Sequence, residues 1–270
     1  MSGAVGEVLS VESADGTRVG CELLGEGPPL LVVHGTIADR RRWRAVRDGL
    51  AARFRVHLMD RRGRGLSTEE TPGEYALERE AEDIRALVGA IGGNVLVLAH
   101  SYGGTCSLEA AVEAPGIERM LVYEPAFAPP GDRVFPHAAL AEVVSVLERG
   151  DRETAVLMFY RHALAMDDEA IAAVKASPLW RVRLEAADTL GRELQAANDY
   201  VLRPERLARI AAPVRFLLGT ETAAALQSST RAAHEALPGS ELLLLPGENH
   251  NAMDTDPEGF VAQVEDWLLR

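Results

Sequence analysis

Short, continuous runs of apolar residues recur along the chain and are separated by stretches of helical length. The runs cover residues 30–33, 56–59, 95–98, 120–123, 214–218 and 242–245. Each run is too short for a helix, and apolar residues without alternation are typical of strands buried on both faces, as in a parallel sheet. Strands that alternate with helices predict a doubly wound α/β fold, with crossover helices on both faces of the sheet.

The stretches between these runs have helical periodicity. The clearest case is 75–91, where Leu77, Ala81 and Ile84 fall on one face of a helix. Further helices are expected at 45–53, 102–114, 223–237 and 257–269. The first segments differ, because residues 8–12 and 18–24 flank the turn sequence Ala14-Asp15-Gly16 and therefore predict an antiparallel hairpin at one edge of the sheet. With this hairpin, the expected sheet has eight strands.

The alternation of strand and helix stops between residues 124 and 213. Four prolines open this segment as an irregular loop, at Pro125, Pro129, Pro130 and Pro136. Helical patterns follow at 138–148, 152–165, 169–176 and 181–201, with no strand-like run among them. The segment therefore predicts a helical cap, inserted after the sixth strand over one end of the sheet. We assign residues 1–127 and 211–270 to the core and 128–210 to the cap.

Composition narrows the class of protein. The chain has 270 residues, 47% of them hydrophobic, which suits one large domain with an insertion. The net charge of −13 argues against nucleic acid and anionic membranes as partners, because both would repel such a surface. Two cysteines, Cys21 and Cys106, do not form a disulfide framework and suit a reducing cytosol. We find no apolar run long enough for a membrane span and no leader-like N-terminus, and we expect a cytoplasmic monomer or homodimer with a small-molecule substrate.

The sequence Ala99-His100-Ser101-Tyr102-Gly103-Gly104 carries the sharpest chemical signal. It follows a predicted strand and begins a predicted helix. Small residues at 99 and 103 allow a tight turn that would present the Ser101 hydroxyl at the carboxyl end of the sheet. The same turn would direct the backbone amide of Tyr102 toward a developing oxyanion. The alternative interpretation is an ordinary helix start with Ser101 as its cap.

Two further loops follow predicted strands. In His34-Gly35-Thr36 the glycine permits a sharp turn, and the amide of Thr36 would serve as a second oxyanion donor. For His34 itself we favour a hydrogen-bonded structural role. The loop Pro246-Gly247-Glu248-Asn249-His250 follows the last strand, where a histidine is well placed to act as a base.

Together these motifs resemble the α/β-hydrolase fold superfamily over essentially the whole chain. The matching segments are 34–35, 60–67, 99–104 and 247–250. The resemblance implies a nucleophile at Ser101, a base at His250 and oxyanion amides at Thr36 and Tyr102. It implies little about the substrate, because this fold serves many chemistries.

The acid of the expected triad is ambiguous. In many relatives it follows the seventh strand, three residues after a glycine, but that position here is Thr222, and Glu221 lies one residue early. A second candidate is Glu124 at the end of the sixth strand, which resembles the acid position of haloalkane dehalogenases. We favour Glu124 and keep Glu221 as the alternative.

Serine at position 101, rather than aspartate, indicates acyl transfer through an acyl-enzyme. We therefore expect a hydrolase of carboxylic esters, thioesters or lactones of small to medium apolar substrates. The alternatives are a cyclase, a carbon–carbon bond hydrolase or a cofactor-free perhydrolase on the same fold, or a scaffold that binds a ligand without turnover.

Other segments are assigned structural roles first. Residues 60–65 follow a strand, and we expect their arginines to brace neighbouring loops rather than bind phosphate. Residues 40–43 are expected to form a solvated helix start. In the cap, Phe159, Tyr160 and Trp180 are candidates to line a substrate pocket, although a cap helix needs such residues for packing. No metal-ligand spacing or dinucleotide fingerprint is present in the sequence, so we expect no metal and no cofactor.

Overall fold

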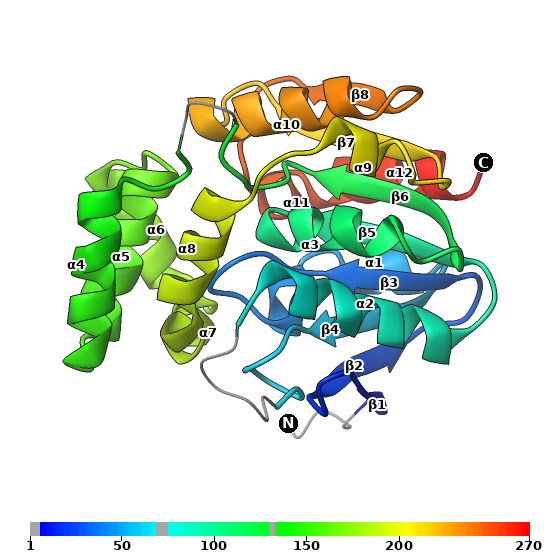
Figure 1. Cartoon of the computed structure of the whole chain (residues 1–270), viewed down its shortest axis with the longest axis horizontal. Coiled ribbons are helices and arrows are strands. Elements are labelled where there is room, and N and C mark those ends of the chain that lie inside the picture. The colour runs from blue at the N-terminus through cyan, green and yellow to red at the C-terminus, as the bar shows by residue number, and fades with distance from the viewer. Residues whose placement is uncertain (1–5, 69–74, 130–132) are drawn as a thin grey trace.

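A computed structural model of the chain describes residues 6–68, 75–129 and 133–270. Over this part of the chain, eight strands form one sheet in the order β1-β2-β4-β3-β5-β6-β7-β8 (Figure 1). The strands are β1 (Glu7–Glu12), β2 (Arg18–Leu24), β3 (Pro29–Val33), β4 (Arg55–Asp60), β5 (Val95–His100), β6 (Ile117–Tyr123), β7 (Val214–Gly219) and β8 (Glu241–Leu245). The predicted hairpin is confirmed, since β1 pairs antiparallel with β2 and β2 with β4, whereas the remaining pairs are parallel.

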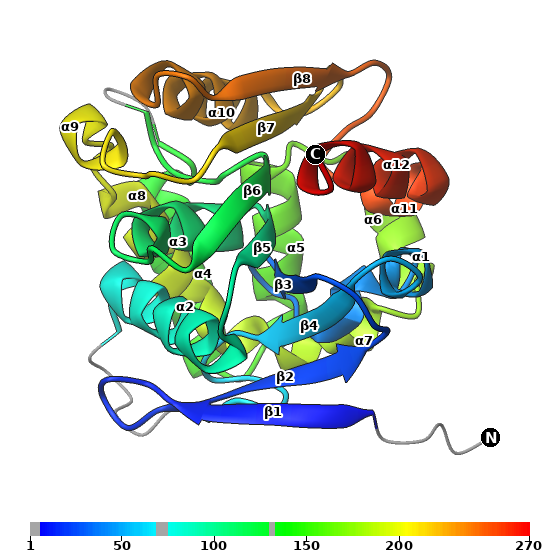
Figure 2. The ribbon, with the colours of Figure 1, turned by 90° about the vertical axis from the view of Figure 1, so that its right-hand side faces the viewer.

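Helices cover both faces of the sheet. In Figure 2, α2 (Leu77–Ile91), α3 (Tyr102–Ala111) and α10 (Ala224–Ala236) lie on one side, and α1 (Arg47–Ala51) and α12 (Pro257–Leu268) lie on the other. The apolar runs explain this arrangement, because successive side chains of a strand point to opposite faces. Leu31 and Val33 of β3 pack in the core on the α2–α3 side. Leu30 and Val32 pack in the core on the α12 side.

A helical cap follows β6, as the sequence predicts. It contains α4 (His137–Glu148), α5 (Arg152–Ala163), α6 (Asp168–Ala176), α7 (Trp180–Glu185) and α8 (Leu190–Asp199). The arrowhead of β6 points toward these helices, so they lie beyond the carboxyl ends of the parallel strands (Figure 1). The cap has its own core, in which Leu140, Val156 and Leu190 are buried. Short helices α9 (Pro204–Leu207) and α11 (Ala252–Thr255) and the 3₁₀ turns Arg40–Trp43 and Ala187–Thr189 complete the fold.

Three expectations differ from the structure. The single helix expected over 181–201 is divided, because the turn Ala187–Thr189 separates α7 from α8. The run at 242–245 is only half buried, since β8 is an edge strand and Leu244 is 43% exposed. The Arg40–Trp43 turn is solvated only in part, because Arg41 is exposed whereas Arg42 and Trp43 are buried. Pro130, in the expected loop, lies outside the described residues.

None of the helices in the described part of the chain is long and apolar enough to cross a membrane.

Candidate active site

Ser101 occupies a strained turn between β5 and α3. Its backbone has φ 57° and ψ −132°, a left-handed conformation that is uncommon for any residue other than glycine and costs about 1–3 kcal/mol. Surrounding structure fixes this conformation, because the Ser101 amide donates to the Tyr123 carbonyl at 2.9 Å and the Gly104 amide donates to the Ser101 carbonyl at 2.8 Å. Ser101 is 7% exposed, and Tyr102 begins α3 directly after it.

Two glycines permit a close approach between the loop after β3 and this turn. A Cβ on Gly35 would lie 2.7 Å from the Cβ of Ser101, and a Cβ on Gly103 would lie 2.2 Å from the His34 carbonyl oxygen. Both distances are shorter than side chains tolerate, so these positions need glycine. The approach brings Thr36 to the cavity that Ser101 lines, and the expected oxyanion residues Thr36 and Tyr102 therefore flank Ser101.

His250 lies against Glu124. One carboxylate oxygen of Glu124, Oε2, pairs with Nδ1 of the His250 ring. The other oxygen accepts hydrogen bonds from the Thr222 hydroxyl at 2.6 Å and from the Gly219 amide at 2.8 Å. Glu124 is fully buried and has a positive φ of 48°. Its carboxylate is therefore fixed in a single orientation relative to the imidazole.

Glu221 does not share this position. It is exposed, and its amide donates to the Glu248 carbonyl. Among the described residues, the Glu221 carboxylate contacts the Thr220 hydroxyl, whereas His250 pairs with Glu124. Thr222, one residue later, is buried and donates to Glu124. The sequence marks Thr222 only as a position without an acid, although a threonine hydroxyl is an ordinary hydrogen-bond donor to a carboxylate.

Two residues from distant segments brace the His250 loop. The hydroxyl of Tyr123, at the end of β6, donates to the Asn249 carbonyl and accepts from the Ala252 amide at 3.3 Å. The guanidinium of Arg42 donates to Asp254 at 2.7 Å and to the Asn251 side chain at 3.0 Å. Arg42 therefore joins the loop after β3 to the loop that carries His250.

Two neighbouring histidines, His34 and His100, are held by backbone groups. Nε2 of His34 accepts from the Arg61 amide at 3.1 Å, and its Nδ1 donates to the Gly35 carbonyl at 2.8 Å. Nε2 of His100 donates to the His250 carbonyl at 3.1 Å, and the two rings lie 4.3 Å apart. Burial lowers the pKa of both His34 and His100 well below the ordinary value, so both rings are neutral.

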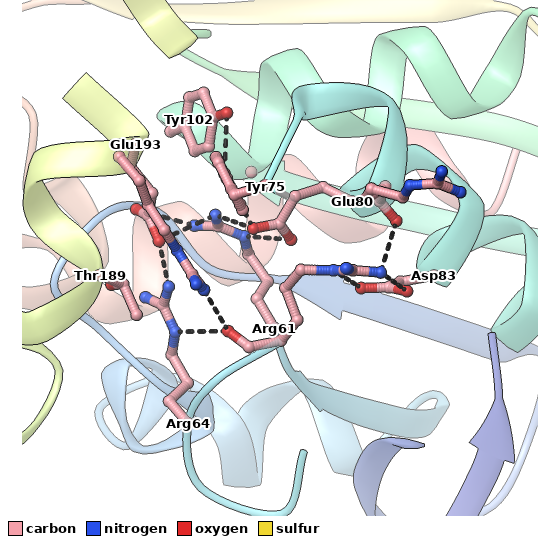
Figure 3. A network of polar contacts seen from close by, with 12 residues as sticks. Arg61, Arg64, Tyr75, Glu80, Asp83, Tyr102, Thr189 and Glu193 are labelled. Atoms are coloured by element: carbon pink, nitrogen blue, oxygen red, sulfur yellow. Dashed lines mark hydrogen bonds and ion pairs between the residues drawn. The ribbon is translucent and has the colours of Figure 1, made fainter. Parts of the chain in front are cut away.

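Behind the loop after β3 lies a buried network of charged residues (Figure 3). Arg61 pairs with Glu80 of α2 at 2.6 Å and with Glu193 of α8 at 3.1 Å, and it also donates to the Gly35 carbonyl at 3.2 Å. Arg64 pairs with the same Glu193 carboxylate. The expectation that this segment braces loops is confirmed. The network also connects the cap to the loop that carries Thr36, which the sequence did not indicate.

Two cavities meet at Ser101. One, of about 30 Å³, is lined by His250, His100, Arg42, Arg183, Tyr160 and other residues. The other, of about 20 Å³, is apolar and is lined by residues such as Leu164, Leu194 and Leu226. Phe159 borders both cavities and Tyr160 the first, whereas Trp180 lines neither and packs in the cap beneath Lys175. The Trp180 position therefore gives no support to a pocket role.

No cluster of three or more histidine, cysteine or acidic side chains is placed to hold a metal ion in the described segments. Cys106 is fully buried, and burial raises the pKa of its thiol well above the ordinary value. Both its burial and its raised pKa disfavour the thiolate, which is the reactive form.

The sequence pattern of the Alpha/beta hydrolase family matches residues 30–263. The chain belongs to this family. A solved alpha/beta hydrolase from Sphaerobacter thermophilus DSM 20745 has 28% identity and a TM-score of 0.82, covering 95% of this chain and 99% of that one. The esterase RhEst1 from Rhodococcus sp. ECU1013 has 25% identity and a TM-score of 0.77, covering 96% and 97%. N-formylmaleamate deformylase from Pseudomonas putida is 33% identical over 114 residues, which are 42% of each chain.

Proposed function

We propose that the protein is a serine hydrolase that cleaves an ester, thioester or lactone through an acyl-enzyme. The observation that carries the proposal is that His250 pairs with the buried carboxylate of Glu124 and lines the same cavity as Ser101. Esterase and deformylase, the names of two relatives, both denote transfer of an acyl group to water.

In the proposed mechanism, the Ser101 oxygen attacks the substrate carbonyl while His250 takes its proton. Glu124 sets the tautomer of His250 and stabilises the imidazolium that forms. The amides of Thr36 and Tyr102 stabilise the tetrahedral oxyanion, an interaction that contributes about 3 kcal/mol per donor in comparable enzymes. His250 then returns the proton to the leaving group and activates water to release the acyl group.

In this proposal, the two sides of the substrate occupy the two cavities at Ser101. A general acid must reach the leaving group, so the leaving group occupies the cavity lined by His250. The acyl group then occupies the apolar cavity near Leu194 and Leu226. The small volume of the apolar cavity favours a short acyl group.

A fluorophosphonate probe tests the proposal, because it reacts covalently with activated serine nucleophiles. We expect the probe to label the native chain at Ser101 and to leave His250→Ala unlabelled. In a separate assay, Ser101→Ala should hydrolyse p-nitrophenyl acetate at least about 10³-fold more slowly than the native protein. A folded Ser101→Ala variant that retains hydrolysis would overturn the assignment. Absence of labelling in the native protein would instead indicate a scaffold without turnover.

A further inference from the structure

The cavity on the His250 side contains polar groups that the proposed triad does not use. Arg183, on α7 of the cap, and Tyr160, on α5, both line it. The Tyr160 side chain is 3% exposed, and its hydroxyl has no hydrogen-bond partner among the described residues. The Arg183 guanidinium carbon lies over the Tyr160 ring, 5.6 Å from the ring centre. The two groups therefore face the same space.

Arg183 also differs from the arginines around it. Within the described segments its guanidinium makes no hydrogen bond or ion pair, and its Nε is enclosed without a partner. On the same helix, Arg181 pairs with Glu185 at 3.1 Å. In the same cavity, Arg42 pairs with Asp254 and Asn251.

An enclosed donor without an acceptor costs free energy, so native structures rarely retain one without a role. This chain has 41 acidic residues against 28 basic ones, so acidic partners for arginine are abundant. A cavity that contains an unpaired guanidinium and an unpaired phenol hydroxyl is therefore suited to an anion supplied from outside the chain. Arg42 adds positive charge to the same cavity, although its own donors are occupied.

We propose that Arg183 and the Tyr160 hydroxyl bind a carboxylate on the leaving-group side of the substrate. The proposal rests on the proposed function and specifies its substrate class, namely short acyl esters of carboxylate-bearing alcohols. The planar fork of a guanidinium matches a carboxylate, and the hydroxyl supplies a further donor. The carboxylate lies on this side because His250, which must protonate the leaving group, lines the same cavity.

The net charge of the protein bears on how an anionic substrate would be bound. A chain with charge −13 repels an anionic substrate in solution. Positive side chains within the cavity compensate for that repulsion at short range, where the low dielectric strengthens their attraction. A neutral ester needs no such compensation. Comparing an anionic ester with a neutral one therefore distinguishes the contribution of Arg183 from that of the triad.

The test compares two esters that differ only in this group, 3-acetoxypropanoate and isopentyl acetate, in which an isopropyl group replaces the carboxylate. We expect the native protein to have a kcat/KM at least about tenfold higher for 3-acetoxypropanoate. We expect Arg183→Met to lower the ratio of kcat/KM for 3-acetoxypropanoate to kcat/KM for isopentyl acetate about thirtyfold. Tyr160→Phe should lower the same ratio about fivefold. Arg181→Met, an exposed change on the same helix, leaves both values unchanged.

A second measurement uses only the native protein. We expect 3-hydroxypropanoate to slow fluorophosphonate labelling of Ser101, and its neutral counterpart 3-methylbutan-1-ol to have no such effect at equal concentration. Equal turnover of the two esters, or equal losses for both in Arg183→Met, would overturn the carboxylate site while leaving the hydrolase intact. Failure of Ser101 to be labelled in the absence of competitor would overturn the hydrolase itself.

Discussion

The hydroxyl of Thr222 donates a 2.6 Å hydrogen bond to the carboxylate of Glu124. Thr222 occupies the position after β7 where the family resemblance places the acid in many relatives, whereas Glu124 follows β6. The carboxylate that faces His250 thus comes from the end of β6, and the loop after β7 supplies the hydroxyl that orients this carboxylate. Both groups are buried, so water does not compete for this bond.

The first prediction concerns Glu124. Glu124→Gln keeps the size of the side chain but removes the charge that stabilises the imidazolium and selects its tautomer. We expect kcat for p-nitrophenyl acetate to fall about 10³- to 10⁴-fold. Glu221→Gln is the matched control, because Glu221 is exposed, and it should change kcat less than about twofold. A large loss in Glu221→Gln with little loss in Glu124→Gln would reverse the assignment.

The second prediction concerns Thr222. Thr222→Val preserves the shape of the side chain but removes the donor to a charged oxygen, an interaction worth about 1.5–3 kcal/mol. We expect kcat/KM to fall about tenfold, and Thr222→Ser to restore most of it because the hydroxyl is retained.

A positioning role for Thr222 has a further consequence. If Thr222 acts through Glu124, the effect of Thr222→Val should nearly vanish in a Glu124→Gln background, as a double-mutant cycle would reveal. Equal losses in both backgrounds would mean that Thr222 acts independently of the carboxylate.

The sequence determines much of the fold because the relevant signals are local. The saturated run at 95–98 predicts a strand buried on both faces, and the small residues around Ser101 predict the tight turn. Both features depend on neighbours within a few residues, and the structure contains both.

The features that the sequence does not determine depend on distant partners. Arg42 would be a solvated helix residue without Asp254, which is 212 residues away in the chain. Thr222 becomes a donor only because Glu124 lies 98 residues earlier, across the β6–β7 pair. The division between α7 and α8 occurs without proline or glycine in the turn Ala187–Thr189, so no local signal predicts it.

The third prediction concerns the network of Figure 3. Glu193 is fully buried and neutralises Arg61 and Arg64, so Glu193→Gln leaves two buried guanidinium groups with less compensating charge. Removing one member of a buried ion pair costs about 3–5 kcal/mol of unfolding free energy. Urea denaturation should show this loss, while Glu153→Gln, which breaks an exposed pair with Lys175, should cost less than about 1 kcal/mol. Comparable losses in the two variants would show that the network contributes no more than a surface pair.

The same residue predicts a dependence of stability on pH. Burial by itself would raise the pKa of Glu193, but Arg61 and Arg64 lower it from 4.5 to about 2. The unfolded state therefore binds a proton at a higher pH than the folded state, so this contribution to stability is present above pH 4.5 and decreases as the pH falls toward 2. Between pH 5 and pH 3, the native protein should lose more unfolding free energy than Glu193→Gln loses. Parallel losses would mean that the ionisation of Glu193 has no part in acid sensitivity.

The last prediction concerns the contact between the loop after β3 and Ser101. In Gly35→Ala the new methyl group would lie 2.7 Å from the Ser101 Cβ and 3.2 Å from its Oγ, so either the serine or the loop carrying Thr36 must move. Overpacking of this kind costs about 1–3 kcal/mol. A shift of the oxyanion amide relative to the nucleophile should lower kcat at least about 100-fold, because displacements near 1 Å have effects of this size.

Gly89→Ala is the control: a Cβ there has no atom within 4 Å, so this helical substitution should stabilise the protein by about 0.5–1 kcal/mol without changing kcat. Retention of full activity in Gly35→Ala would show that the loop tolerates displacement and that the amide of Thr36 is not a required oxyanion donor.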